Sequence, residues 1–82
     1  MNVTVLFFAS LREALGVERE RIALEAGATV DSLRAQLVAR GERWQPLSRG
    51  SVRAAVNQSL VGGAVSLADG DEVAFFPPVT GG

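Results

Sequence analysis

The sequence Glu72-Val73-Ala74-Phe75-Phe76-Pro77-Pro78 decides the fold of this chain. Residues 72–76 predict a β-strand, because β-branched and aromatic side chains are enriched in strands. The two prolines have no N–H group to donate to a sheet, so the strand ends at Phe76. The turn-forming sequence Asp69-Gly70-Asp71 precedes the strand and marks its beginning. The last strand is therefore bounded on both sides.

A second apolar segment, Val3 to Phe8, predicts a strand near the N-terminus. The sequence Ser10-Leu11-Arg12-Glu13 matches a capping box, so we expect a short helix that is capped by Ser10 and stops at Gly16. Alternating polar and apolar residues from Arg21 to Glu25 predict a second strand, which ends at Gly27.

The principal helix is expected to follow. Thr29 is a suitable cap, and Asp31 in the first turn is favoured by the positive end of the helix dipole. Gly41 is a suitable stop. The apolar positions of this segment fall on one helical face and are Val30, Leu33, Leu37 and Val38. The helix should therefore pack on one side of a sheet.

The remainder of the chain predicts further short strands. We expect residues 42–51 to be irregular, with Trp44 and Leu47 folding back onto the core. The segment Val52 to Asn57 predicts a third strand, and Leu60-Val61 predicts a short strand that pairs with it.

The order of elements predicts an α+β fold of the β-grasp (ubiquitin-like) type, with a mixed sheet and one principal helix packed on one face. The first and last strands are the most apolar, so we place them side by side and parallel at the centre. A ferredoxin-like α+β fold is the alternative, but it needs a second full helix that residues 42–51 do not supply. We expect residues 1–76 to form the domain and residues 77–82 to form an extended, flexible tail.

The chain has more apolar strand residues than one sheet face can hold, because neighbouring side chains point to opposite faces. We assign Val3, Val5, Phe7, Val73 and Phe75 to the helix-facing core. Leu6, Phe8 and Phe76 then lie on the open face, joined by Leu60. We interpret Phe8, Leu60 and Phe76 as a partner interface beside the tail. The alternative is that residues 42–51 wrap round and bury them.

The composition argues against catalysis by this chain alone. Its 82 residues include no Cys, His or Tyr, so it has no thiol nucleophile and no general base of the usual kind. We expect no metal site, because the nine acidic residues are scattered. We expect no nucleic-acid binding, because the eight basic residues form no block and the net charge is −1.

The apolar runs are too short to cross a membrane, and no secretory signal is visible, so we expect a cytoplasmic protein. All eight basic residues are Arg. The chain therefore has no Lys amine that could attack an activated carboxyl group or carry Lys-linked polymers of the protein.

The sequence ends in Pro77-Pro78-Val79-Thr80-Gly81-Gly82, and we expect this segment to be the tail. The prolines bias its base toward a stiff, extended path. The whole segment can reach about 20 Å, at about 3.3 Å per residue. Gly81 and Gly82 need the least channel width, so the tail can enter a narrow active site on another protein and present the Gly82 carboxylate.

The C-terminal pattern D-G-D-E-V-A-F-F-P-P-V-x-G-G, within Leu67 to Gly82, resembles the small subunit of molybdopterin synthase, a family of ubiquitin-like sulfur carriers. Val5-Leu6-Phe7-Phe8-Ala9 followed by Arg12-Glu13 extends the resemblance to the N-terminus. Ala55-Val56-Asn57-Gln58 extends it to the third strand. The resemblance therefore spans most of the domain.

The resemblance implies a mechanism that other proteins catalyse. A ubiquitin-activating-like adenylyltransferase would use ATP to adenylate the Gly82 carboxylate, and a sulfur-donating enzyme would supply the sulfur of a Gly82 thiocarboxylate. The large subunit of molybdopterin synthase would then accept the tail and pass the sulfur to cyclic pyranopterin monophosphate. Two such transfers build the dithiolene of molybdopterin. The family forms a tetramer of two small and two large subunits, and the chain itself binds no cofactor.

The resemblance also implies roles for single residues. Gly82 carries the sulfur, and Pro77, Pro78, Val79, Thr80 and Gly81 complete the functional tail. Phe8, Leu60 and Phe76 would contact the large subunit. The alternatives are a sulfur carrier for thiamine biosynthesis or another pathway, a ubiquitin-like protein modifier conjugated to Lys on its targets, and a plain interaction domain with an incidental tail.

Overall fold

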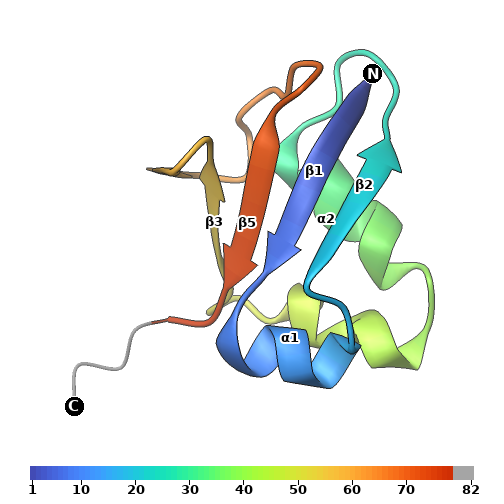
Figure 1. Ribbon diagram of the computed structural model, residues 1–82, viewed down its shortest axis with the longest axis vertical. Coiled ribbons are helices and arrows are strands. Elements are labelled where there is room, and N and C mark those ends of the chain that lie inside the picture. Colours follow the sequence, from blue (N-terminus) through green and yellow to red (C-terminus); the bar gives the residue numbers. More distant parts are fainter. Residues whose placement is uncertain (79–82) are drawn as a thin grey trace.

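The computed structural model describes residues 1–78, and in this part of the chain five strands form one mixed sheet (Figure 1). The sheet order is β2-β1-β5-β3-β4, with bounds β1 (Asn2–Phe7), β2 (Arg19–Ala23), β3 (Arg53–Val56), β4 (Ser59–Val61) and β5 (Glu72–Phe76). As predicted, β1 and β5 lie side by side at the centre and run parallel. The other neighbouring strands are antiparallel. The predicted α+β β-grasp architecture is confirmed.

Helix α2 (Val30–Val38) lies behind the sheet in Figure 1 and covers one face of it. Helix α1 (Ala9–Leu15) and the 3₁₀ helix η1 (Glu42–Ser48) lie at the end of the sheet where β1 and β5 finish. The ferredoxin-like alternative is wrong, because α1 is only 7 residues long and joins the antiparallel neighbours β1 and β2 instead of crossing over.

The N-terminus of α2 has the predicted cap. The Thr29 hydroxyl accepts a hydrogen bond from the Ser32 N–H at 3.1 Å, and the Ser32 hydroxyl accepts one from the Thr29 N–H at 2.8 Å. Two backbone donors that the helix leaves unpaired are thereby satisfied. Asp31 lies in the first turn, as predicted, and Gly41 follows the helix end with a φ of 138°.

The predicted capping box at Ser10 is wrong. Phe8 is the N-cap of α1, and no side chain caps this helix. The Phe8 N–H donates to the Phe75 carbonyl at 3.2 Å, so the hydrogen bonding between β1 and β5 continues as far as Phe8. The helix begins at the next residue, Ala9, which has a φ of 52°. Ser10 therefore falls inside the first turn. The predicted stop at Gly16 is confirmed, with a left-handed φ of 72°.

Strand β2 begins and ends two residues earlier than the prediction of 21–25. Its pairing runs along β1 as far as Leu6, which lies opposite Arg19. At its other end the Glu25 carbonyl accepts from the Ala28 N–H at 3.2 Å, so the chain already turns away from the sheet there.

Residues 42–51 were expected to be irregular, and this expectation is wrong for 42–48, which form η1. A short 3₁₀ helix has no distinctive hydrophobic period, so the sequence pattern does not reveal it. The expectation that Trp44 and Leu47 fold onto the core is confirmed, because both are buried. The Trp44 ring meets the Phe7 ring edge-on at 5.8 Å between centroids.

All residues assigned to the helix-facing core are buried there, namely Val3, Val5, Phe7, Val73 and Phe75. The rings of Phe7 and Phe75 stack across the two central strands, with centroids 6.2 Å apart. One aromatic pair thus joins the first and last strands beneath α2.

Two polar contacts hold the turns at the opposite end of the sheet. The Asn57 side chain donates to the Asp71 carboxylate at 2.9 Å and accepts from the Glu72 N–H at 3.0 Å. Asn57 and Gln58 have positive φ values of 49° and 71°, which form the tight turn between β3 and β4. The Asn57–Asp71 contact therefore fixes the hairpin that presents Leu60.

Candidate functional site

The open face of the sheet, opposite α2, carries an apolar row. The strand register places Leu6 beside Ala74, Ala74 beside Ala55, and Ala55 beside Leu60. The two alanines are small, so the larger side chains at either end stand above the centre of the row. Leu60 is 68% exposed, the highest value among the large apolar residues of the described chain.

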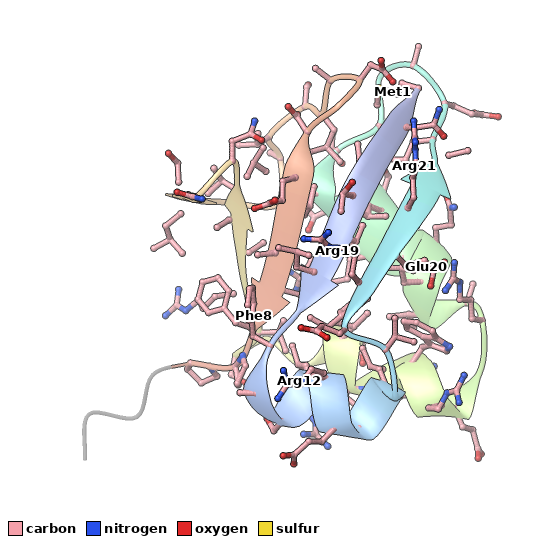
Figure 2. All side chains as sticks on the ribbon, in the orientation of Figure 1. Met1, Phe8, Arg12, Arg19, Glu20 and Arg21 are labelled. Atoms are coloured by element: carbon pink, nitrogen blue, oxygen red, sulfur yellow. The ribbon has the colours of Figure 1, made fainter. Side chains whose placement is uncertain are left out.

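Two aromatic residues extend this row toward the C-terminal end of β5. Phe8 follows β1 directly and is 46% exposed, and Phe76 is the last residue of β5 and is half-buried. Figure 2 shows Phe8 on the same side of the sheet as the viewer, with α2 behind. We call Leu6, Phe8, Leu60 and Phe76 the apolar patch.

The predicted placement of Phe8, Leu60 and Phe76 on the open face is thus confirmed, while their role in binding stays a prediction. The alternative, that residues 42–51 bury them, is wrong. Segment η1 packs against α1 and α2, and its Trp44 and Leu47 enter the core on the covered side of the sheet.

The base of the predicted tail begins at the apolar patch. Strand β5 ends at Phe76, Pro77 is half-buried and Pro78 is exposed, and the chain leads away from the sheet there (Figure 1). The predicted tail residues Val79, Thr80, Gly81 and Gly82 lie outside the described residues.

Arginines border the apolar patch. Arg19 and Arg21 are exposed and occupy alternate positions of β2, which places both on the open face beside Leu6 and Thr4. Arg53 lies at the opposite edge of the apolar patch, where it is the register partner of Phe76 in the pairing of β3 with β5. A rim of charge around an apolar centre is typical of a protein-binding surface.

This arginine rim was not predicted from the sequence. The predicted second strand began at Arg21, so Arg19 was placed in a connection instead of on the sheet. The available signal was the alternation of Arg19, Glu20 and Arg21 before the buried Ile22, which assigns the two arginines to one face.

Glu20 points to the other side of β2 and has a structural role. Arg40 donates from Nη1 to Glu20 Oε1 at 2.9 Å and from Nη2 to Oε2, which ties β2 to the end of α2. These hydrogen bonds hold the pKa of Glu20 below its ordinary value, against a smaller opposing effect of burial. The Arg40 guanidinium also lies 4.7 Å from the centroid of the Trp44 ring.

Among residues 1–78, no group of three or more acidic, His or Cys side chains is arranged to hold a metal ion. Within the same residues, no helix combines the length and the apolar character needed to cross a membrane. The open face presents apolar side chains bordered by arginines, which is a composition typical of protein-binding surfaces.

The sequence matches the ThiS family over residues 5–82. The chain belongs to the ThiS family. A relative in Escherichia coli (strain K12), the molybdopterin synthase sulfur carrier subunit, is 49% identical over 81 residues, which cover 98% of this chain and 99% of the relative. The resemblance to the small subunits of molybdopterin synthase is therefore confirmed.

Solved structures agree with this ThiS family assignment. In a complex of subunits 1 and 2 of molybdopterin-converting factor from Helicobacter pylori 26695, one chain matches with a TM-score of 0.72 and 30% identity over 100% of both chains. The protein SAMP1 from Haloferax volcanii matches with a TM-score of 0.80 and 26% identity, also over 100% of both chains.

Proposed function

We propose that this chain is the sulfur carrier subunit of molybdopterin synthase. The observation that carries the proposal is the 49% identity to the E. coli sulfur carrier subunit over 98% of this chain and 99% of that relative. The open face supports it, because a carrier must dock on other proteins and the apolar patch offers a surface for docking. The chain would act in the cytoplasm and would not be an enzyme on its own.

The proposed chemistry takes place at the Gly82 carboxyl group. One carboxylate oxygen attacks the α-phosphorus of ATP in an adenylyltransferase of the ubiquitin-activating kind, and pyrophosphate leaves. Hydrosulfide supplied by a sulfur-donating enzyme then attacks the acyl carbon and displaces AMP, which converts the carboxyl group to a thiocarboxylate. Activation is needed first, because a carboxylate oxygen is a poor leaving group. This chain contributes the carboxyl group, and its partners contribute the catalytic groups.

Sulfur delivery then depends on docking. The apolar patch would bind the large subunit of the synthase, with Phe8, Leu60 and Phe76 as the buried contacts. Pro77 and Pro78 begin at the edge of this patch, so a docked carrier would direct its tail toward one point on the partner. There the thiocarboxylate sulfur would displace an oxygen substituent of cyclic pyranopterin monophosphate, and water would then hydrolyse the resulting thioester, which leaves the sulfur on the pterin and returns the Gly82 carboxylate. Two such transfers would form the dithiolene.

Reconstitution of the synthase tests the proposal. The chain with a Gly82 thiocarboxylate, mixed with the large subunit and cyclic pyranopterin monophosphate, should form molybdopterin. A variant extended by one residue after Gly82 should bind the large subunit equally well and form no product. Product formation by the extended variant would contradict the proposed role of the Gly82 carboxyl group. A lack of binding by the unextended chain would contradict the synthase assignment itself.

The second candidate function is conjugation to other proteins. It is favoured by the similarity to SAMP1, the small archaeal modifier protein 1 of H. volcanii. A modifier would be joined through Gly82 to Lys side chains of target proteins. Immunoblotting of native cell extract separates the two functions, since a modifier produces a ladder of larger adducts that withstands reducing agents, whereas a carrier produces a single band. A carrier for thiamine synthesis would give the same single band and would be distinguished by its failure to bind the large synthase subunit.

A further inference from the structure

The open face has a hollow at the β2 side of the apolar patch. The hollow has a volume of about 400 Å³ and is lined by Leu6, Phe8, Glu18 and Arg19. Leu6 and Phe8 belong to the apolar patch as well, so the hollow and the patch form one continuous surface. We call this feature the Arg19 hollow.

Positive charge is concentrated around the Arg19 hollow. Arg19 and Arg21 are exposed, and neither side chain makes a hydrogen bond or ion pair with any residue in 1–78. Figure 2 shows both on the viewer's side of the sheet, with Arg12 below them on α1. The nearest acidic partner is Glu18, which lies 3.9 Å from Arg12 with the two side chains 77% and 52% exposed. Such an exposed pair is weak.

This concentration of charge is not explained by folding. The whole chain has a net charge of −1, whereas the residues beside the hollow carry three guanidinium groups against the Glu18 carboxylate, and the next carboxylate on this face, Glu72, is separated from Arg21 by Thr4 of β1. Like charges on neighbouring positions of one sheet face repel each other. Charged residues do protect an edge strand such as β2 from pairing with other chains, but side chains of mixed sign would do so equally well. The uncompensated arginines therefore fit a partner that brings negative charge.

We infer that the Arg19 hollow receives an acidic side chain, Glu or Asp, from the protein that docks on the apolar patch. The aliphatic part of that side chain would pack on Leu6 and Phe8, and its carboxylate would accept two hydrogen bonds from the Arg19 guanidinium. Arg12 and Arg21 would add attraction without direct contact. The inference rests on the proposed function, since it takes the partner to be the large subunit of the synthase.

A protein partner fits the Arg19 hollow better than a nucleic acid does. Two of the four lining residues are apolar, and the hollow opens onto a patch of further apolar side chains. A phosphate backbone would need a continuous basic track, whereas the apolar patch separates Arg19 and Arg21 on β2 from Arg53 on β3. The apolar wall instead suits the methylene groups of an acidic side chain.

The test is a charge reversal at Arg19. Binding of the large synthase subunit is measured by calorimetry for the wild type, for Arg19→Glu and for the control Arg43→Glu. Arg43 lies on η1, on the covered side of the sheet, so the control makes the same change of charge away from the patch. Arg19→Glu should weaken binding about tenfold or more, because it sets two carboxylates against each other in a partly desolvated site. Arg43→Glu should change the affinity less than about twofold.

Further measurements decide between the outcomes. Thermal unfolding of each variant must match the wild type, as expected for an exposed side chain. Substitution of a partner Glu or Asp by Arg should restore the binding of Arg19→Glu.

Equal affinity of Arg19→Glu and wild type would overturn the inference and leave the proposed function standing. If the wild type itself fails to bind the large subunit, the proposed function is wrong and the inference falls with it. A single-stranded RNA that binds the wild type and not Arg19→Glu, with large-subunit binding unchanged, would also overturn the inference.

Discussion

Gly63 lies against the first turn of α2, and replacing it tests how closely the chain fits there. A Cβ at position 63 would overlap the Asp31 carboxyl group, whereas a Cβ at Gly62 would meet nothing within 4 Å. Two backbone hydrogen bonds hold the loop of residues 62–65 against the first turn of α2. The Asp31 N–H donates to the Gly63 carbonyl at 2.9 Å, and the Val30 N–H donates to the Val65 carbonyl at 3.1 Å. Gly63→Ala therefore forces either the carboxylate or the loop to move.

The cost follows from what each movement would lose. If the Asp31 carboxylate rotates away, α2 loses a favourable charge at its positive end, which is worth roughly 0.3–1 kcal/mol. If the loop moves instead, the two backbone hydrogen bonds weaken, each worth about 1 kcal/mol. We expect Gly63→Ala to lower the free energy of unfolding by about 1 kcal/mol, which corresponds to a fall in Tm of about 4–8 °C for a domain of this size.

The assay is urea or thermal unfolding of four variants: Gly63→Ala, Gly62→Ala, Asp31→Ala and the double variant Gly63→Ala with Asp31→Ala. Gly62→Ala should stay within about 0.5 kcal/mol of the wild type. In the Asp31→Ala background, Gly63→Ala should have little further effect, because the overlapping carboxylate is gone. Equal effects of Gly63→Ala in both backgrounds, or of Gly62→Ala and Gly63→Ala in the wild type, would refute this reasoning.

Three further predictions concern the cap, the ion pair and the apolar patch. Thr29→Ala should lower the free energy of unfolding by about 1 kcal/mol through loss of the cap, as measured by urea unfolding, with Thr29→Ser close to the wild type. The Glu20–Arg40 pair lowers the pKa of Glu20, so its stabilisation is fully present above the ordinary carboxyl value of 4.5 and is lost as the pH falls through the lowered value. Unfolding curves measured against pH should therefore show the wild type losing its advantage over Glu20→Gln in acid, and a constant difference would contradict the assignment. Leu60→Arg should leave the free energy of unfolding within about 0.5 kcal/mol and weaken calorimetric binding of the large subunit about tenfold, and unchanged binding would exclude Leu60 from the interface.

The strongest sequence patterns predicted the fold. The two central strands were predicted from their high content of β-branched and aromatic residues. Their central, parallel pairing was predicted because they are the most apolar strands of the chain. The Thr29 cap and the Gly16 stop were also predicted, because a cap depends on a few neighbouring residues. These features depend on local chemistry, and no distant contact overrides them.

The predictions from the sequence were wrong where a contact between residues distant in the chain sets the boundary of a helix or strand. Ser10 has the right chemistry for a cap, but β1 extends to Phe8, which donates to Phe75 in the neighbouring strand, and the helix begins directly after it, two residues earlier than predicted. The start of β2 depends on its register with β1, which no local pattern reveals. That shift also concealed the Arg19 hollow, because Arg19 joins the open face only when β2 begins there.

The placement of the apolar patch was predictable for a different reason. The alternation of strand side chains fixed the face of Leu6 and Phe76 once Phe7 and Phe75 were assigned to the core. The exposure of Leu60 depended on the β3–β4 hairpin, which the Asn57–Asp71 contact holds. The proposed function requires such a face, because it places the reaction of Gly82 in the active sites of other proteins.

The mass of the intact protein from its native cells tests the central claim most directly. The chain is purified without reducing thiols at neutral pH, its mass is recorded, and C-terminal fragments are sequenced in the mass spectrometer. A carrier should show a fraction of molecules in which sulfur replaces one oxygen, and the fragments should place the exchange at Gly82. Only unmodified protein under conditions of active cofactor synthesis, or Gly82 found in isopeptide linkage to Lys of other proteins, would contradict the assignment of this chain as a sulfur carrier.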